Sequence, residues 1–223
     1  MRNIVLILLI LTMLTGLCFA SSPVALVLKT KGEISLMRSN EQISIKEGTP
    51  VYNEDKLVSG DESFALIKFV DGGATMKLFA NSIMTVNAEK SEDKLNKSMF
   101  LQVGNAFSKV NKGKGEYKIE TPTTVASVKG TEGFIFVDED GKTLIITIKG
   151  IFEMLNKISG KTVPVPAGRT GSSSSDGSTD EYQSGDLDPS LFEGLEEGTA
   201  PGILKIYVTD ESGETKIIEI ELE

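Results

Sequence analysis

Short segments in which apolar and polar residues alternate are the feature that most limits the fold of this chain. They recur from residue 24 to residue 165, separated by breaks rich in glycine and aspartate. Alternation puts successive side chains on opposite faces of a β-strand, whereas an amphipathic helix needs a period of about 3.6 residues. The chain is therefore predicted to be all-β, a twisted sandwich or a solenoid-like stack. The expected strands cover residues 24–28, 33–37, 42–45, 63–69, 74–78, 83–86, 100–103, 106–110, 117–120, 134–137, 143–148, 151–155 and 161–165.

Four segments give finer predictions. Residues 63–69 are apolar on nearly both faces, which is typical of a central strand. Residues 74–78 alternate, so Ala74, Met76 and Leu78 are expected to face inward. A hairpin is predicted around residues 138–141, where an Asp-Gly pair supplies the positive φ of a tight turn. The polar residues 89–98 are expected to form an exposed loop or one helical turn.

The N-terminus is typical of a secretory signal peptide over residues 1–20. Arg2 precedes an apolar run, and a turn-prone Thr-Gly leads to a small residue, Ala20, near which cleavage is expected. The run is too short to cross a bilayer easily, although an uncleaved anchor is the alternative. Leu17 is bulky and stands before Cys18, which disfavours lipid attachment. The mature chain is thus expected outside the cytoplasm, in the periplasm, at the cell surface or secreted.

Composition divides the rest of the chain into three parts. Residues 21–170 carry a net charge of +2 and form the predicted β-domain, whereas residues 171–223 carry −12. Residues 171–202 are predicted to be a flexible, acidic linker rich in Ser and Gly, and residues 203–223 a second β-hairpin. Two strands alone are marginal in water, so this hairpin is expected to dock on the main sheet or to pair with another chain. Such charge disfavours a nucleic-acid partner.

Several stretches, in order, resemble the FecR domain, a β-rich extracytoplasmic module of bacterial envelope proteins. The strongest is the block at residues 121–131, TPTTVASVKGT, and the segment LVSGDESFALIKFVDG at residues 57–72 is similar as well. The likeness spans about residues 24–170. The positions that match the family motifs, interpreted as structural, are Gly60, Asp71, Gly72, Thr121, Pro122, Lys129, Gly130, Thr131 and Gly150.

The residues themselves support structural roles for this block. Proline cannot donate to a sheet ladder, so Thr121 and Pro122 are expected at a strand start or edge. Gly130 is interpreted as a bend where another strand approaches closely, with a binding surface formed together with Lys129 as the functional alternative. Lys129 stands where the family more often has Arg, which weakens any two-pronged carboxylate contact. Family members that regulate sigma factors have a cytoplasmic part ahead of a membrane span; here the signal is expected to lead directly into the β-domain, so that activity is not carried over.

The expected function is a non-catalytic envelope module that binds a protein or polysaccharide as a scaffold or sensor, without a cofactor. The chain has no His and a single Cys, which removes most routes to nucleophilic catalysis, general base catalysis near neutral pH and zinc binding. Membrane contact is expected only through an uncleaved signal, and the oligomeric state stays open.

Three alternatives remain open. The first is an enzyme that uses paired carboxylates on a glycan, with Asp61-Glu62 and residues 138–140 as candidates, although solvated turn acids lack the burial that shifts a pKa. The second is calcium binding by residues 138–141 and the acidic tail, which lack the ligand spacing of a known calcium loop. The third is a disordered docking segment anchored by Leu191 and Phe192, rather than a plain spacer.

Overall fold

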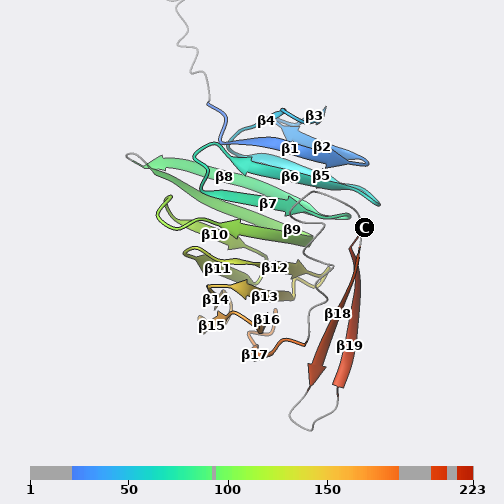
Figure 1. The fold of residues 1–223 in the computed structure, drawn as a ribbon, viewed down its shortest axis with the longest axis vertical. Helices are drawn as coiled ribbons and strands as arrows, with labels where there is room; N and C mark the ends of the chain where they lie inside the picture. Colours follow the sequence, from blue (N-terminus) through green and yellow to red (C-terminus); the bar gives the residue numbers. More distant parts are fainter. Residues whose placement is uncertain (1–21, 92–93, 186–201, 210–214, 223) are drawn as a thin grey trace, which may run out of the picture.

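The computed structural model describes residues 22–91, 94–185, 202–209 and 215–222 (Figure 1). The predicted signal peptide, its cleavage point at Ala20 and the tail residues Leu191 and Phe192 lie outside this part of the chain. The described residues form strands and turns without a helix, which confirms the all-β prediction. It follows that none of the described segments is an apolar helix of membrane-spanning length.

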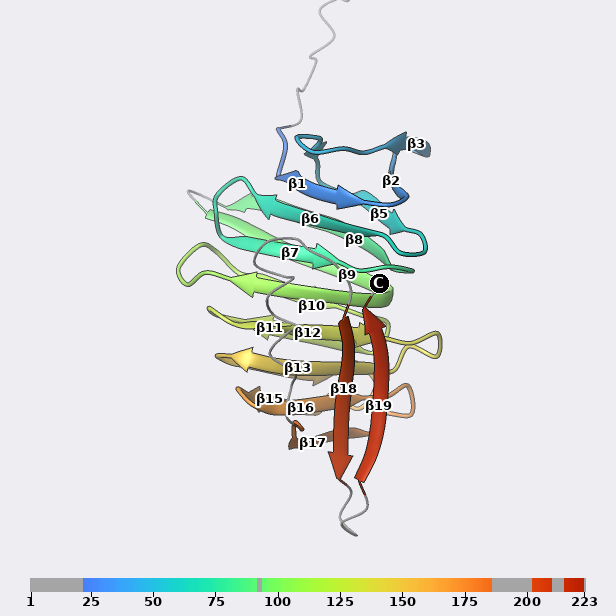
Figure 2. The same ribbon diagram turned by 45° about the vertical axis from the view of Figure 1, so that its right-hand side comes forward.

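The strands stack in two layers, and each layer is built almost entirely from antiparallel neighbours (Figure 2). The first layer contains, in order, β4 (Pro50–Val51), β1 (Ala25–Lys31), β6 (Phe64–Phe69), β7 (Ala74–Leu78), the second half of β9 (Lys94–Val110), β12 (Glu132–Val137), β13 (Thr143–Lys149), β16 (Arg169–Ser173) and β17 (Thr179–Gln183). The second layer contains β3 (Glu41–Ser44), β2 (Ile34–Arg38), β5 (Asp55–Ser59), β8 (Ile83–Ser91), the first half of β9, β10 (Tyr117–Glu120), β11 (Thr124–Val128), β14 (Ile151–Asn156) and β15 (Thr162–Pro166). Only the β9–β10 pair is parallel among these.

Strand β9 belongs to both layers and joins them into one sheet of 17 strands that is not closed into a barrel. Its first half pairs with β8 and its second half with β7 and β12. The change of layer occurs at Gly104, which has φ +99°. A Cβ there would lie 2.6 Å from the Cα of Ser82, so the bend needs glycine both for its φ and for space. The two strands expected at residues 100–103 and 106–110 are therefore one bent strand.

The prediction of a loop or helical turn at residues 89–98 is wrong. Strand β8 continues to Ser91 and β9 begins at Lys94, with Glu89 opposite Asn96. Residues 89–91 and Lys94 are exposed at this end of the hairpin, whereas Leu95 packs against the core and Lys97 is buried. Backbone pairing is sufficient there, and no apolar alternation is left in the sequence to reveal the strands.

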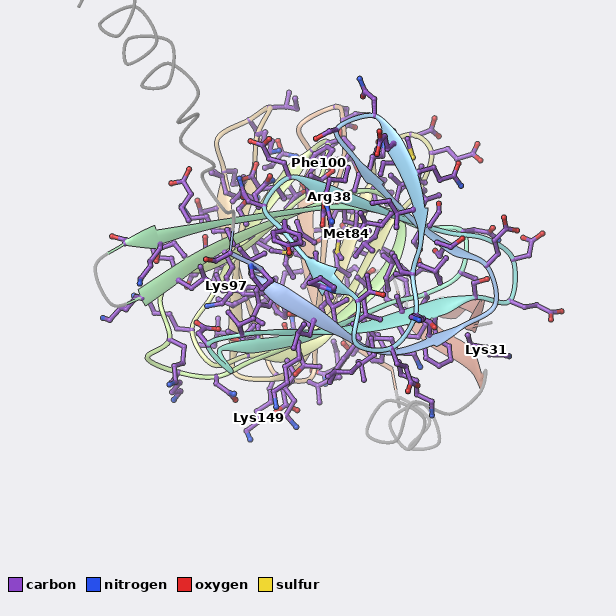
Figure 3. The ribbon with its side chains drawn as sticks, turned by 90° about the horizontal axis from the view of Figure 1, so that it is seen from above. Lys31, Arg38, Met84, Lys97, Phe100 and Lys149 are labelled. Atoms are coloured by element: carbon purple, nitrogen blue, oxygen red, sulfur yellow. The ribbon has the colours of Figure 1, made fainter. Side chains whose placement is uncertain are left out.

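The core fills the space between the two layers. Ala74, Met76 and Leu78 are all at most 1% exposed, which confirms their inward orientation. Strand β6 lies between β1 and β7, as its two apolar faces predicted. Seen from above, Met84 lies inside the stack and Lys31 and Lys149 lie at its periphery (Figure 3). Larger fully buried side chains of the core are Leu36, Leu57, Ile67, Phe69, Met99, Leu101, Ile119, Phe152 and Met154.

Part of the segment predicted as a flexible linker, residues 171–202, forms strands, and residues 186–201 of that segment lie outside the described part of the chain. Strands β16 and β17 occupy residues 169–173 and 179–183, and β16 pairs with β13. Gly171 serves packing here, because a Cβ at this position would lie 2.5 Å from Val165 Cγ2. Glycine at this position, which in the sequence suggests a linker, therefore allows β16 to lie close to the opposite layer. The C-terminal hairpin is confirmed: β18 (Gly202–Thr209) and β19 (Thr215–Leu222) pair in a two-stranded sheet of their own.

Candidate binding groove

A groove of about 610 Å³ lies at one end of the second layer, and we call it the lysine groove. Three turns wall it: residues 111–116 between β9 and β10, residues 129–131 between β11 and β12, and Gly150 between β13 and β14. Its floor is formed by the adjoining ends of β10, β11 and β14. The lining residues are Lys112, Gly115, Glu116, Tyr117, Lys118, Ser127, Val128, Lys129, Gly130, Gly150, Ile151 and Glu153.

Lysines dominate the charge of this surface. Lys112, Lys118 and Lys129 line the groove, and an adjoining hollow of about 690 Å³ adds Lys94. The carboxylates of the two hollows are Glu116 and Glu153, of which Glu116 pairs with Lys118 at 3.4 Å in an exposed contact. Within the described part of the chain, no carboxylate lies in ion-pair range of the other three lysines. The surface therefore presents uncompensated positive charge to solvent.

Two glycine turns of the family motifs give the groove its shape. Gly130 has φ +75°, and a Cβ on it would lie 2.2 Å from Lys112 Cγ, so the Lys112 stem lies directly across this turn. Gly150 has φ +81°, and its Cβ would lie 2.8 Å from the carbonyl oxygen of Gly130. The backbones of the two turns are in direct contact, and a side chain on either glycine would push them apart. Both glycines and the exposed Lys129 thus meet in one wall.

Thr131 fastens this wall from behind. Its side chain is fully buried and its Oγ1 donates a 2.9 Å hydrogen bond to the carbonyl oxygen of Ile151. The bond links the β11–β12 turn to the first residue of β14 across the gap between the two glycine turns. Thr131 therefore positions the wall and does not itself face a ligand.

Asp71 reaches the groove indirectly, through a buried lysine. Lys97 is 3% exposed, and its Nζ donates to Asp71 Oδ2 at 2.7 Å and to the carbonyl oxygens of Leu95 and Lys114 at 2.7 and 2.8 Å. Asp71 Oδ1 in turn accepts a 2.8 Å hydrogen bond from the N–H of Gly73. Because Lys114 belongs to the first wall of the groove, this ion pair anchors that wall to the sheet.

The remaining motif residues lie away from the groove. Gly60 donates its N–H to the carbonyl oxygen of Glu33, and Gly72 takes φ +66° in the β6–β7 turn. Thr121 is buried and its Oγ1 lies 2.7 Å from Thr143 Oγ1. Pro122 is exposed in the turn between β10 and β11, at the end of these strands opposite the groove. Of the nine sequence-predicted positions, the structure brings Lys129, Gly130 and Gly150 together in the groove, with Thr131 behind them.

Groups suited to catalysis are not gathered in this groove. Tyr117 lies below its floor with its hydroxyl buried, where it accepts a 3.0 Å hydrogen bond from Ser108 Oγ, and burial raises the pKa of Tyr117. The candidate acids Asp61 and Glu62 are exposed in the β5–β6 turn, and residues 138–140 are exposed in the β12–β13 turn. Among the described residues, no three His, Cys, Asp or Glu side chains are grouped closely enough to hold a metal ion.

Reasoning from the sequence missed Lys112, Lys118 and Glu153 as groove residues. One signal was present, because residues 111–118 read NKGKGEYK, a run in which lysines are interleaved with glycines. Such a loop exposes both its charges and its backbone, which favours a ligand over a packing role. Its closeness to Lys129 depends on the β9–β10–β11 pairing and has no local signature.

The FecR protein family model matches residues 55–152, which run from β5 into β14. No curated protein matches the chain in sequence. Two crystal structures, each of a candidate anti-sigma factor from Parabacteroides distasonis, are similar in fold. One has a TM-score of 0.52 at 12% identity, covering 66% of each chain, and the other a TM-score of 0.49 at 13% identity, covering 57% of this chain and 59% of that one.

Both matches span less than two thirds of the solved chains, and the one with a TM-score of 0.52, at 12% identity, shows the fold alone. The family match is more direct, since it includes every one of the motif positions identified from the sequence. It also includes the three turns that wall the lysine groove. This protein therefore carries a FecR domain over residues 55–152.

Proposed function

We propose that this chain is an exported, non-catalytic FecR module that acts as a sensor or regulator in the cell envelope by binding an acidic segment of a partner protein in the lysine groove. The observation that carries this proposal is the groove itself. Its lysines come from two turns and from strands β9 and β10, and they converge on a hollow with few carboxylates. Positive charge left without partners at the mouth of a hollow favours an anionic ligand.

A protein segment suits the groove better than a small metabolite. The two adjoining hollows share the residues Lys112, Gly115, Glu116, Val128 and Lys129, so they form one extended depression. Ile151 is 49% exposed at its edge and offers an apolar contact beside the charges. An extended peptide with acidic residues next to an apolar one complements this arrangement. The lysines would attract its carboxylates, and Ile151 would contact its apolar side chain.

The proposed role also follows from the family. The FecR protein family model matches this chain, and a solved protein of similar fold is described as a candidate anti-sigma factor, which supports a regulatory role. Export of this chain, as its N-terminus predicts, places binding outside the cytoplasm. A module that binds and carries no catalytic group transmits its signal through contact, so the partner is expected to be a second envelope protein.

Charge reversal in the groove tests the proposal. Full-length protein is expressed in its native cell with Lys112→Glu and Lys129→Glu together, and partners are captured by crosslinking and identified by mass spectrometry. The matched control is Lys142→Glu with Lys161→Glu, two exposed lysines at the opposite end of the strands. Both pairs change the net charge equally.

A protein partner captured by the wild type and the control, and lost in the groove variant, supports the proposal. The same interaction is expected to weaken as salt rises, because contacts between exposed charges are screened. Capture of the same set of proteins by both variants shows that the groove is not the site. An anionic polysaccharide recovered in place of a protein also overturns the proposal as stated.

A further inference from the structure

Three exposed apolar side chains gather at one corner of the first layer, near the start of β1. Leu26, Leu28 and Val70 are 40%, 44% and 54% exposed. The other large apolar side chains with high exposure in the described part of the chain are Ile151 and Ile158, which belong to β14 and to the turn after it. We call the first three residues the leucine corner.

The strand pairing holds the leucine corner on the outer side of the sheet, away from the core. Leu26 lies opposite Lys68 of β6. Phe69 is buried in the core, so alternation turns its neighbours Lys68 and Val70 to the outer side. A β-bulge in β1 leaves Leu28 without a partner residue in β6. The exposure of these residues thus follows from the strand pairing itself.

A row of charged residues continues from Leu26 across the same face, and we call it the lysine row. Its members lie opposite one another on neighbouring strands, in the order Lys68 on β6, Thr75 on β7, Lys109 on β9, Glu132 on β12 and Lys149 on β13. Glu132 lies 3.7 Å from the ammonium of Lys109 and 4.0 Å from that of Lys149, so two lysines share one carboxylate. Within the described residues, Lys68 has no carboxylate in ion-pair range. The row therefore carries an excess of positive charge.

The lysines of this row are open to solvent. The side chains of Lys109 and Lys149 are 49% and 74% exposed, and Lys68 is exposed as well. Figure 3 shows Lys149 pointing away from the stack. Apolar groups next to lysines on one open face suit a lipid–water interface, because the apolar groups enter the headgroup region while the lysines attract anionic lipids.

The position of β1 in the chain favours the same ligand. This strand begins at Ala25, five residues after the expected cleavage point at Ala20, and five residues span at most about 18 Å. Export therefore brings β1 within that distance of the bilayer, with the signal cleaved or retained. The lysine row also crosses five neighbouring strands. Its charges thus lie on a broad face, which suits a planar surface better than a narrow protein segment.

We propose that the leucine corner and the lysine row form a docking surface for a bilayer that carries anionic phospholipids. Leu26, Leu28 and Val70 enter the headgroup region, and the lysines lie level with the lipid phosphates. The folded domain itself makes this contact, which goes beyond the membrane contact expected through an uncleaved signal. The chain as a whole has a net charge of −9, so the attraction depends on the local excess of lysine and weakens as salt rises. The surface belongs to the first layer and is separate from the lysine groove in the second.

Tryptophan fluorescence tests the docking surface, because the chain contains no natural Trp. Leu28→Trp in the mature chain, residues 21–223, places a single reporter in the leucine corner. Ile158→Trp is the matched control, since this residue is 62% exposed in the turn between β14 and β15, near the other edge of the sheet. Each variant is titrated with vesicles of phosphatidylglycerol and phosphatidylcholine in equal parts, and with vesicles of phosphatidylcholine alone.

With the anionic vesicles, the emission of Leu28→Trp is expected to shift to shorter wavelength, while that of Ile158→Trp stays unchanged. Adding Lys68→Gln and Lys149→Gln is expected to lower the vesicle affinity of Leu28→Trp at least about fivefold, because each lysine near an anionic surface contributes attraction. The control pair Lys142→Gln and Lys161→Gln changes the net charge equally at the opposite end of the strands. It is expected to leave the affinity within about twofold, because distant exposed charges are screened.

An emission maximum of Leu28→Trp that does not move with anionic vesicles overturns the docking surface. An equal shift of Ile158→Trp does so too, because the protein would then adsorb without a preferred face. Equal affinities for the two kinds of vesicle, or equal losses with the two lysine pairs, overturn the role of the lysine row and with it the proposal as stated. An unchanged urea midpoint shows that Leu28→Trp is folded, and Leu26→Trp replaces it as the reporter if that midpoint falls.

Discussion

The buried ion pair between Asp71 and Lys97 offers the sharpest test of how the fold supports the groove. Replacing Asp71 by Asn removes one negative charge while retaining an oxygen that can still accept the N–H of Gly73. The side chain of Lys97 is 2% exposed and that of Asp71 is 22% exposed. The ammonium group would then remain buried against two carbonyl oxygens and the ring of Phe69, which lies 5.7 Å from its Nζ.

The magnitude follows from that burial. Removing one partner of a buried pair typically costs 3–5 kcal/mol, because an uncompensated charge stays inside the protein. Asp71 is partly hydrated, and both carbonyl oxygens continue to hold Lys97, so we expect about 2–3 kcal/mol for Asp71→Asn. Lys97→Met leaves the carboxylate of Asp71 near water and places an apolar chain on Phe69. Its expected cost is smaller, about 1 kcal/mol.

Urea unfolding of the mature chain, followed by circular dichroism, measures both costs. The double variant completes a cycle, and its coupling energy is expected to be about 1–2 kcal/mol, since Asp71→Asn costs little once the ammonium is absent. Hydrogen exchange of residues 111–116 gives a second readout. Asp71→Asn is expected to accelerate exchange there, because Lys97 holds the carbonyl oxygen of Lys114.

If Asp71→Asn costs no more than Lys97→Met, the buried ammonium does not depend on its carboxylate. Simple additivity of the two substitutions would likewise show that the two groups are not coupled. Unchanged exchange in residues 111–116 would separate the groove wall from the ion pair, and would leave only a local role for Asp71.

Three further predictions concern other parts of the domain. Gly150→Ala is expected to destabilise the fold by about 2–5 kcal/mol, because it adds both a positive-φ strain and a clash with a carbonyl oxygen. Gly113→Ala, at φ +80° with nothing within 4 Å of the new Cβ, is expected to cost about 1 kcal/mol, and equal falls in melting temperature for the two variants would refute the clash. Burial lowers the pKa of Lys77 from 10.5 to about 8, so the cost of burying its charge is present below pH 8 and fades as pH rises to 10.5. Across that window the wild type should gain on the order of 3 kcal/mol of unfolding free energy relative to Lys77→Met. Unfolding free energies from urea denaturation that change with pH in parallel for the two proteins would contradict this. Asp55 is 1% exposed, and Arg38 donates to its carboxylate at 2.8 and 2.7 Å. Asp55→Asn should therefore lower the unfolding free energy, measured by urea denaturation, by about 2–4 kcal/mol, and Arg38→Lys by about 1 kcal/mol. The reverse order would show that the two-pronged contact matters more than the buried carboxylate.

Much of the secondary structure could be predicted from the sequence because strand residues are half buried. Where one face meets the core, alternation appears in the residues, as in β7, whose range matches the expected one. The β12–β13 hairpin was predictable from its turn residues, since the Asp-Gly pair places Gly141, with φ +78°, at the turn. The prediction failed where burial gives no alternation. Residues 89–91 and 94 are exposed and pair through their backbones, and β16 ends in the small residues 171–173, which also suit a linker.

The candidate site shows the same division. The family motifs identified Lys129, Gly130 and Gly150, which are local patterns, but not what these residues face. Lys112 and Lys118 join them only because β9 pairs in parallel with β10, and β10 with β11. Such pairings between distant segments are decided by the whole hydrophobic core, and no short stretch of sequence carries them.

By itself, then, the sequence determined an all-β chain with a FecR domain and a separate C-terminal hairpin. It did so because strand periodicity and turn chemistry are local. The tertiary structure decided how the strands divide into two layers, which lysines share a groove, and that Gly104 and Gly171 serve close packing instead of flexibility. Glycine looks alike in a bend, a linker and a contact, and only the atoms around it distinguish these roles.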